Sequence, residues 1–169
     1  AHKLARDRKG NVLTCLIHIV DPQLCSLLRE QEIETRKMDA FRLEFFNVFE
    51  SGARALLNEF PVDKTQNQRP HILIVGLGRM GESLLVQAAR NWKTIHSVTG
   101  EKLRITLIDK EAETKNESLC LRYLQLDKIC LLIPQQMDIN SPEFKQARFL
   151  FDNNGNWDGA PAFHAYPYS

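Results

Sequence analysis

The sequence predicts an α/β fold in which helices flank a parallel β-sheet. Short β-branched apolar runs alternate with segments of helical periodicity, and one of these runs leads directly into a glycine-rich turn at residues 76–81. Runs that are apolar throughout are typical of strands whose sheet is covered on both faces. With 169 residues, 43% of them hydrophobic, the chain is long enough to bury such a sheet. The order of strand, glycine-rich turn, helix and strand is typical of a Rossmann-type sheet.

The first strand is expected over residues 12–20, which form a nearly continuous apolar run. Asp21 and Pro22 suit the cap and the first turn of a helix that follows it. From Asp39 the sequence predicts another helix, because apolar residues recur at every fourth position and would form one stripe. That stripe is expected to face the core, and it comprises Phe41, Phe45, Phe49, Ala53 and Leu57.

A polar stretch without periodicity predicts a linker over residues 61–70 and a domain boundary there. The elements expected next are a strand over 71–75, a helix over 80–92, a polar loop over 97–102 and a strand over 103–108. After these we expect a helix over 111–126, a strand over 129–133 closed by Pro134, and a helix from 141 to 151. The tail over 152–169 has no period and is expected to be irregular, so the sheet has no obvious fourth strand.

Composition excludes several classes of function. The formal net charge of +1 does not point to a nucleic-acid backbone as the principal partner. No apolar run approaches the roughly 20 residues of a membrane-spanning helix. The first residue is not an initiator methionine, and no secretory signal follows it, so we expect the chain to be cut from a longer protein. The four cysteines form no C-x-x-C pair, and no Cys/His cluster has ligand spacing, so no metal site is predicted.

The glycine-rich turn carries the strongest functional prediction. In such a turn Gly76 allows the tight bend, Gly78 lets the backbone approach a pyrophosphate, and Gly81 lets the helix pack closely on the strand. Backbone N–H groups at the start of the helix would face the phosphates. Asp109, at the end of the next strand, would accept hydrogen bonds from the ribose hydroxyls. The interval from Gly76 to Asp109 is longer than usual, and we assign the excess to the loop around Gly100.

The side chains near the turn bear on which nucleotide would bind. The carboxylate of Asp109 would repel a 2′-phosphate and so favours NAD, NADH or an adenosine ligand over NADP, although the adjacent Lys110 weakens that preference. Arg79, inside the turn, is placed to reach a phosphate or to lie solvated on the first helical turn. Glycine turns of this kind also occur where no ligand binds, so a purely structural turn is the alternative interpretation.

No catalytic residue is predicted. His18 lies in an apolar strand, where a hydrogen-bonded core histidine is the ordinary interpretation. Neither Ser51 nor Ser83 has a recognisable base partner, and no nucleophile elbow is present in the sequence.

The residues of the turn and its flanking strands resemble the N-terminal nucleotide-binding domain of TrkA and the RCK domains, which regulate potassium conductance. The resemblance is carried by His71-Ile-Leu-Ile-Val-Gly-Leu-Gly-Arg-Met-Gly-Glu82 and Ile105-Thr-Leu-Ile-Asp109-Lys110, and it covers about residues 70–151. The segment from Thr14 to Leu24 is similar to the late strand and helix of the same family's domains. The resemblance therefore implies the end of one RCK-like domain over 1–60, and a nucleotide-binding half over 71–151.

By this resemblance the phosphates of NAD, NADH, ATP or ADP would be surrounded by Gly76, Leu77, Gly78, Arg79, Met80 and Gly81. Asp109 and Lys110 would lie at the ribose. The family is regulatory, because ligand binding shifts paired domains and so gates a membrane-embedded potassium channel or transporter subunit. The resemblance thus implies a homodimer at the cytoplasmic face of a membrane, without chemistry of its own.

Two other functions stay open from the sequence. The same turn serves hydride transfer, so the chain is alternatively a fragment of an NAD-dependent oxidoreductase whose substrate domain lies elsewhere. The third interpretation is a scaffold domain, in which the stripe of Phe41, Phe45 and Phe49 packs against a partner and the glycine turn binds nothing.

Overall fold

The computed structural model describes residues 13–35, 41–62, 70–146 and 163–165 of the chain. It is an α/β structure with two parallel sheets flanked by helices. The chain divides into two compact units, residues 1–51 and 52–169, and the division falls inside a helix. The sequence placed the boundary later, in residues 61–70. The difference arises because Ala53 and Leu57, which follow the division in that helix, are buried in the core of the second unit.

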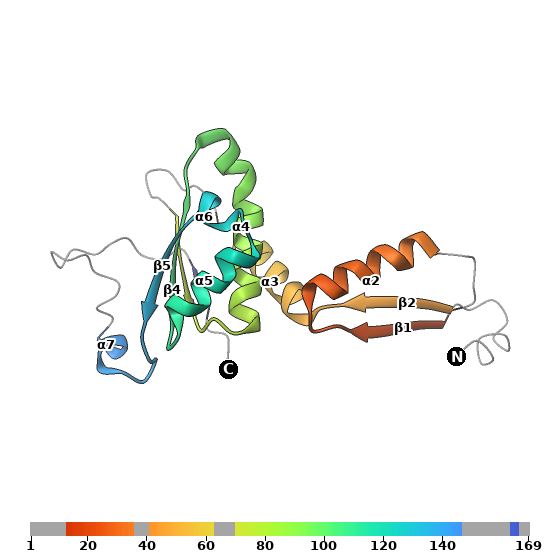
Figure 1. Cartoon of the computed structure of the whole chain (residues 1–169), viewed down its shortest axis with the longest axis horizontal. Helices are drawn as coiled ribbons and strands as arrows, with labels where there is room; N and C mark the ends of the chain where they lie inside the picture. The colour runs from red at the N-terminus through yellow and green to blue at the C-terminus, as the bar shows by residue number, and fades with distance from the viewer. Residues whose placement is uncertain (1–12, 36–40, 63–69, 147–162, 166–169) are drawn as a thin grey trace. The chain divides into compact units, whose positions relative to one another are not determined.

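The first unit is a strand-helix-strand crossover. Strand β1 (Leu13–His18) and strand β2 (Phe41–Phe46) pair in parallel, from Leu13 opposite Phe41 to His18 opposite Phe46. Helix α2 (Pro22–Thr35) connects them and lies along the strand pair (Figure 1). As predicted, Asp21 caps this helix, because its carboxylate accepts hydrogen bonds from the N–H groups of Gln23 at 2.8 Å and Leu24 at 3.1 Å.

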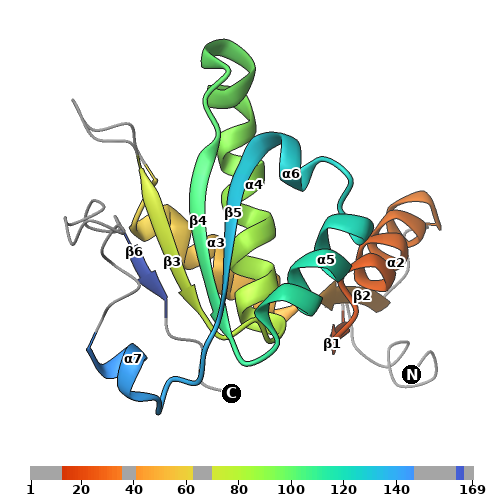
Figure 2. The same ribbon diagram turned by 60° about the vertical axis from the view of Figure 1, so that its left-hand side comes forward.

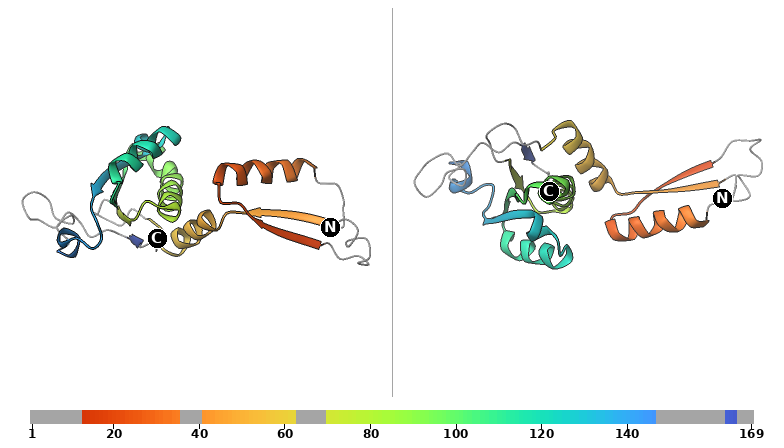
Figure 3. Two further views of the ribbon diagram at one scale, coloured as in Figure 1. Left: turned by 60° about the horizontal axis from the view of Figure 1, so that its bottom comes forward. Right: turned by 90° about the horizontal axis from the view of Figure 1, so that it is seen from above.

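One face of the β1–β2 pair is covered by α2, and the side chains of β1 that point to the other face are exposed. Residues of β1 alternate between half-buried and exposed, and Leu16 is 71% exposed. Both views in Figure 3 show α2 on a single side of the two strands. His18, predicted to be a core histidine, is instead exposed, and its ring lies 5.4 Å from that of Phe46. It lies on the face that α2 leaves open, because side chains alternate between the two faces of a strand.

The prediction of one helix from Asp39 was wrong. Residues Phe41–Phe46 form β2, and helix α3 (Val48–Glu59) begins only afterwards. Asn47 separates the two elements: its amide donates to the carbonyls of Ile19 at 2.9 Å and Val20 at 2.8 Å, and its Oδ1 accepts from the N–H of Glu50. The buried Asn47 therefore both caps α3 and ties it to the end of β1.

The second unit contains a parallel sheet of four strands in the order β5-β4-β3-β6 (Figure 2). These strands are β3 (His71–Val75), β4 (Leu103–Asp109), β5 (Cys130–Gln136) and β6 (Phe163–Ala165). The helices are α4 (Arg79–Thr99), α5 (Ala112–Arg122), α6 (Leu126–Ile129) and α7 (Pro142–Lys145). The chain starts in β3, moves outward through β4 to β5, and returns to the other side of β3 with β6. This is the strand order of a Rossmann-like half, which has its switch point beside the first strand.

The largest core cluster lies between this sheet and the helices α3 to α6. Its fully buried side chains include Trp92 of α4 and Ile105 of β4. On the opposite face a smaller cluster joins Leu73, Val75 and Ile108, with Phe144 of α7 packed against it. Every residue of β3 is buried, as a strand inside a parallel sheet requires.

Several element boundaries differ from the prediction. Helix α4 continues to Thr99, through the first half of the expected loop, and ends where Gly100 adopts a φ of 72° and donates to the carbonyl of His96. Strand β5 runs through Pro134 instead of ending there, because β5 is an edge strand and tolerates a missing N–H. The predicted helix over 111–126 is shorter and is followed by the separate α6.

The remaining differences concern the C-terminal segment. Helix α7 ends at Lys145, and residues 147–151 of the predicted helix lie outside the described part of the chain. The tail was expected to be irregular, but Phe163–Ala165 forms β6 and supplies the fourth strand, while 152–162 and 166–169 are not described. Most of the predicted linker, residues 63–69, is also not described. Within the described residues, no helix has the length and apolar character needed to cross a membrane.

Candidate nucleotide site

The glycine-rich turn joins the carboxyl end of β3 to the start of α4. Gly76 has a φ of 88°, a conformation that strains residues with a Cβ, and its N–H donates to the carbonyl of Ile108 at 2.7 Å. That bond continues the ladder between β3 and β4 by one residue. The turn is thus held at the carboxyl edge of the sheet, where open α/β sheets bind their ligands.

Gly81 allows α4 to approach the turn closely. A Cβ at this position would overlap the carbonyl oxygen of Gly76 and would lie 3.1 Å from its carbonyl carbon and 3.4 Å from Cγ2 of Ile74. These are backbone and buried atoms, which cannot move aside cheaply. The third glycine therefore has the packing role expected from the sequence.

Gly78 has a different environment. It is exposed, its φ of −78° is open to any residue, and a Cβ placed on it would meet nothing within 4 Å. Gly78 is the N-cap residue of α4, and the helix's first internal hydrogen bond runs from the N–H of Glu82 to the carbonyl of Gly78 at 2.9 Å. The N–H groups of the first turn have no partner inside the helix, and they lie at the positive end of the dipole of a 21-residue helix.

Asp109 ends β4 next to the turn and holds it in place. Its Oδ2 accepts from the N–H of Leu77 at 2.7 Å, and its Oδ1 accepts from the N–H of Glu111 at 2.9 Å and from Nζ of Lys115 at 2.8 Å. A carboxylate has about four acceptor positions, and these bonds use three of them. Among the described residues, one position on Oδ2 is left for a hydroxyl donor.

The surroundings of Asp109 favour its charged form. Burial acts to raise its pKa, since the side chain is only 12% exposed, but the hydrogen bonds from Lys115, Glu111 and Leu77 outweigh burial and lower the pKa below its usual value. The group is therefore an anion at neutral pH. A ribose hydroxyl can donate to it, whereas a 2′-phosphate would meet like charge.

We predict that Asp109→Asn lowers the free energy of unfolding by about 2 kcal/mol at pH 7, because the neutral amide cannot accept all three hydrogen bonds that the anion accepts. A carboxyl whose pKa is depressed by folding stabilises the protein above the unfolded-state pKa, and this stabilisation is lost as pH falls through the folded-state pKa. The difference between variant and parent should therefore shrink below about pH 4. Urea unfolding at several pH values measures this difference in the free energy of unfolding.

The matched control is Asp127→Asn, at an exposed position of α6 in the same unit. We expect it to change stability by less than about 0.5 kcal/mol. Equal losses in the two variants, or a loss in Asp109→Asn that does not depend on pH, would contradict the role given to the Asp109 carboxylate.

The end of β5 lies beside Asp109 and extends the candidate site. The N–H of Met137 donates to the carbonyl of Asp109 at 3.0 Å, and Nζ of Lys110 lies 2.9 Å from Oδ2 of Asp138. The ion pair and the hydrogen bond from the N–H of Asn140 lower the pKa of Asp138, with the hydrogen bond contributing most. Lys110 is thus paired with Asp138, while Lys115 is the lysine that contacts Asp109.

The predicted residues at the turn contribute in different ways. The side chain of Leu77 is buried in the core and its N–H already binds Asp109, so Leu77 shapes the turn. Met80 is packed against the same core, and its Cε would lie 3.0 Å from a Cβ at Gly52, so only its backbone faces the turn. Arg79 is exposed at the first position of α4, next to Gly78. Its guanidinium is therefore accessible to a ligand.

Glu82 connects the first turn of α4 to the end of α5. Its Oε1 accepts from Nη1 of Arg122 at 2.6 Å and from the hydroxyl of Tyr123 at 3.0 Å. Burial and the negative charge of Glu82 raise the pKa of Tyr123, so its hydroxyl keeps its proton at neutral pH. The end of α5 is thereby fixed to the helix that follows the glycine turn.

The sequence did not predict the contributions of Lys115 and Asp138. Asp138 had a readable signal, since it lies just after β5 and Asp109 lies at the end of β4, and the carboxyl ends of parallel strands share one edge. Lys115 had only the weaker signal of its i, i+4 spacing from Glu111, and the distance between their charged atoms is 3.7 Å.

Among the described residues, no group of three or more histidine, cysteine, aspartate or glutamate side chains could hold a metal ion. The four cysteines are free thiols, and burial raises the pKa of Cys130 to about 12, which makes it unreactive. Comparison of the chain with family models, curated proteins and solved structures found no match.

Proposed function

We propose that the turn from Gly76 to Gly81, together with Asp109, binds NAD(H) or an adenine nucleotide. The observation that carries the proposal is the contrast between two glycines: a Cβ at Gly81 would strike the backbone of Gly76, whereas one at Gly78 would stand in open space. Packing within the unit therefore explains why residue 81 is a glycine, but it gives no reason for a glycine at position 78. A backbone left bare at a helix N-terminus suits the close approach of a pyrophosphate.

The polar groups around the turn suit the other parts of such a ligand. The remaining acceptor position of Asp109 is placed for a ribose hydroxyl, and the exposed Arg79 for a phosphate oxygen. The negative charge of Asp109 favours NAD or NADH over NADP. Because Lys110 is paired with Asp138, it does less to offset that preference than the sequence alone indicated.

A thermal-shift series tests this proposal directly, since a ligand that binds only the folded chain raises its melting temperature. We predict that NAD, NADH, ATP or ADP raises the melting temperature in a concentration-dependent way and that NADP has a smaller effect. Inorganic phosphate at the same concentrations is the control for a nonspecific anion effect. An equal shift with phosphate, or no shift with any nucleotide, would contradict the proposal.

We further propose that the nucleotide is regulatory and that the chain belongs to a potassium transport system, as an RCK-like module. The resemblance of the turn and of the segment from Thr14 to Leu24 supports this role. A regulatory ligand acts only if it binds one arrangement of the domains more tightly than the other. In this proposal the arrangement is that of a homodimer at the cytoplasmic side of a membrane-embedded channel or transporter.

The transport role has a test separate from nucleotide binding. Gly78→Val would be introduced into the gene in the organism that produces the chain, and potassium uptake would be measured. The proposal expects a changed uptake rate at an unchanged level of the protein. Unchanged uptake, in a variant shown to have lost nucleotide binding, would overturn the transport role and leave the oxidoreductase interpretation.

A further inference from the structure

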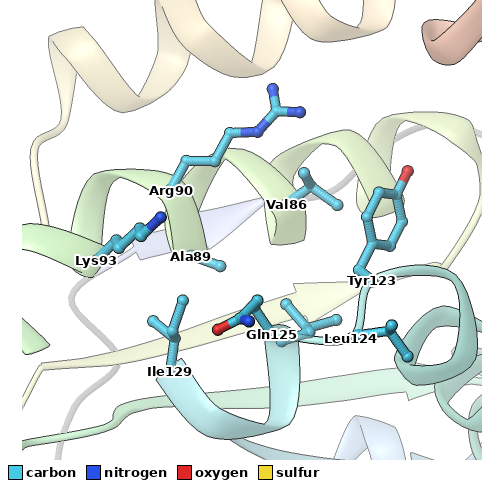
Figure 4. Close-up of a pocket in the computed structure, with 9 residues that line it drawn as sticks. Val86, Ala89, Arg90, Lys93, Tyr123, Leu124, Gln125 and Ile129 are labelled. Atoms are coloured by element: carbon cyan, nitrogen blue, oxygen red, sulfur yellow. The ribbon is translucent and has the colours of Figure 1, made fainter.

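A hollow of about 230 Å³ lies on the second unit, away from the glycine turn, between α4 and the segment where α5 leads into α6. Its lining includes Val86, Ala89, Arg90, Lys93, Tyr123 and Leu124. Figure 4 shows the α4 residues on one side of it and Gln125 and Ile129 on the other. None of these residues belongs to the candidate nucleotide site.

The lining combines apolar walls with positive charge. Six of the nine lining residues present apolar groups or an aromatic ring, and Leu124 is 72% exposed at the edge. The only charged residues in the lining are Arg90 and Lys93, both cations and both exposed, so they stand at the rim. In Figure 4 the guanidinium of Arg90 is turned away from α6, which leaves Lys93 as the cation closer to the hollow.

We propose that this hollow binds a small carboxylate whose apolar body has the size of a single aromatic ring. The volume of the hollow indicates the size of the ligand, because an apolar cavity of about 150 Å³ accepts benzene and drug-sized ligands need about 300 Å³ or more. The positive charge of Lys93 indicates the chemical class of the ligand, because a lysine ammonium at the mouth of an apolar hollow favours one anionic group over a neutral one.

The wall formed by Tyr123 is fixed before any ligand arrives. Its hydroxyl donates to Glu82 at 3.0 Å, and Glu82 is also held by Arg122. The ring therefore does not have to be ordered on binding, which lowers the entropic cost of binding. The ring also offers an aromatic face or edge to a ring of the ligand.

The test is an NMR titration of the full chain with phenylacetate, using phenylacetamide as the uncharged probe of the same shape and acetate as the charge without the ring. We expect saturable shifts of the resonances of Val86, Ala89 and Tyr123 with phenylacetate. Phenylacetamide should bind about tenfold more weakly, and acetate should not saturate. Absence of saturable shifts, or shifts centred on Gly78 and Asp109 instead, would overturn the proposal.

Variants separate the two parts of the proposal. Ala89→Leu fills the hollow and should abolish the titration, and Lys93→Gln should reduce affinity for phenylacetate to that for phenylacetamide. Lys128→Gln, an exposed lysine of α6 outside the lining, is the matched control and should bind as the parent does. If Ala89→Leu fails to fold, the Lys93→Gln variant still tests the proposal, because Lys93 is exposed. Equal affinity of Lys93→Gln and the parent for phenylacetate would overturn the assignment of a carboxylate.

Discussion

Replacing Gly81 by alanine is expected to lower the free energy of unfolding by about 3 kcal/mol, at the upper end of overpacking costs. The new methyl group would overlap the carbonyl oxygen of Gly76 and press on Ile74 behind it. Gly76 cannot move aside freely, because its N–H is bonded to Ile108 and its φ of 88° fixes the bend. Urea unfolding followed by circular dichroism measures the loss.

Gly78→Ala is the matched control for that experiment, since it adds the same methyl group three residues earlier. The methyl group would meet nothing within 4 Å, and the backbone conformation suits alanine. The expected loss is only about 0.5 kcal/mol, from the poorer N-cap residue. Similar losses in the two variants would contradict the close approach of α4 to Gly76.

The second large effect concerns ligand affinity. We expect Gly78→Val to weaken nucleotide binding by about a hundredfold, because the branched side chain would occupy the space in which a pyrophosphate approaches the backbone. Stability should change little, since the side chain projects into open space and φ is −78°. Parallel measurements of affinity and melting temperature distinguish this result from unfolding.

Ser97→Val adds a branched side chain near the other end of α4, at an exposed position far along the helix from the turn. This control should retain the affinity of the parent chain. If Gly78→Val binds a nucleotide as tightly as Ser97→Val does, the nucleotide does not lie over the glycine turn, and the turn serves only the architecture.

The parts of the fold that were predicted correctly depend on local sequence. The run over residues 71–75, the glycine turn and the run that ends at Asp109 each contain their own signal of apolar residues or glycines. Asp21 was likewise readable as a helix cap, because its hydrogen bonds reach only two and three residues ahead.

The errors in the predicted fold have two causes. Some sequence patterns fit two kinds of structure equally well, and some elements form only through pairing with residues far away in the chain. Phe41 and Phe45 fit a helical stripe, yet Phe41, Leu43 and Phe45 also alternate with polar residues, and pairing with β1 selects the strand. Gly100 was assigned to a loop, although a glycine at that place equally marks the end of a longer helix. Strand β6 could not be predicted, since only its pairing with β3 defines so short a strand.

The residues of the candidate site also differ in whether the sequence could predict them. The three glycines and Asp109 could be predicted, because their spacing relative to two strands is visible in the sequence. The position of Lys115 could not, because it depends on how α5 begins. For Asp138 the sequence offered a signal for the edge of the sheet, but that β5 lies beside β4 is decided by pairing between distant residues. Those residues determine the charge around the site, so the expected preference among nucleotides became sharper only with the structure.

The most direct test of the central claim is isothermal titration of the purified chain with NAD, NADH, ATP and ADP, beside Asp109→Asn. Circular dichroism at the same temperature verifies that each protein is folded. We predict saturable binding of at least one nucleotide, with one ligand per chain, and markedly weaker binding by the variant, because its neutral amide has one acceptor oxygen in place of two and that oxygen is needed by the bonds that hold the turn. Failure of every nucleotide to bind the folded parent chain, or equal binding by Asp109→Asn, would contradict the assignment of the glycine turn and Asp109 as a nucleotide site.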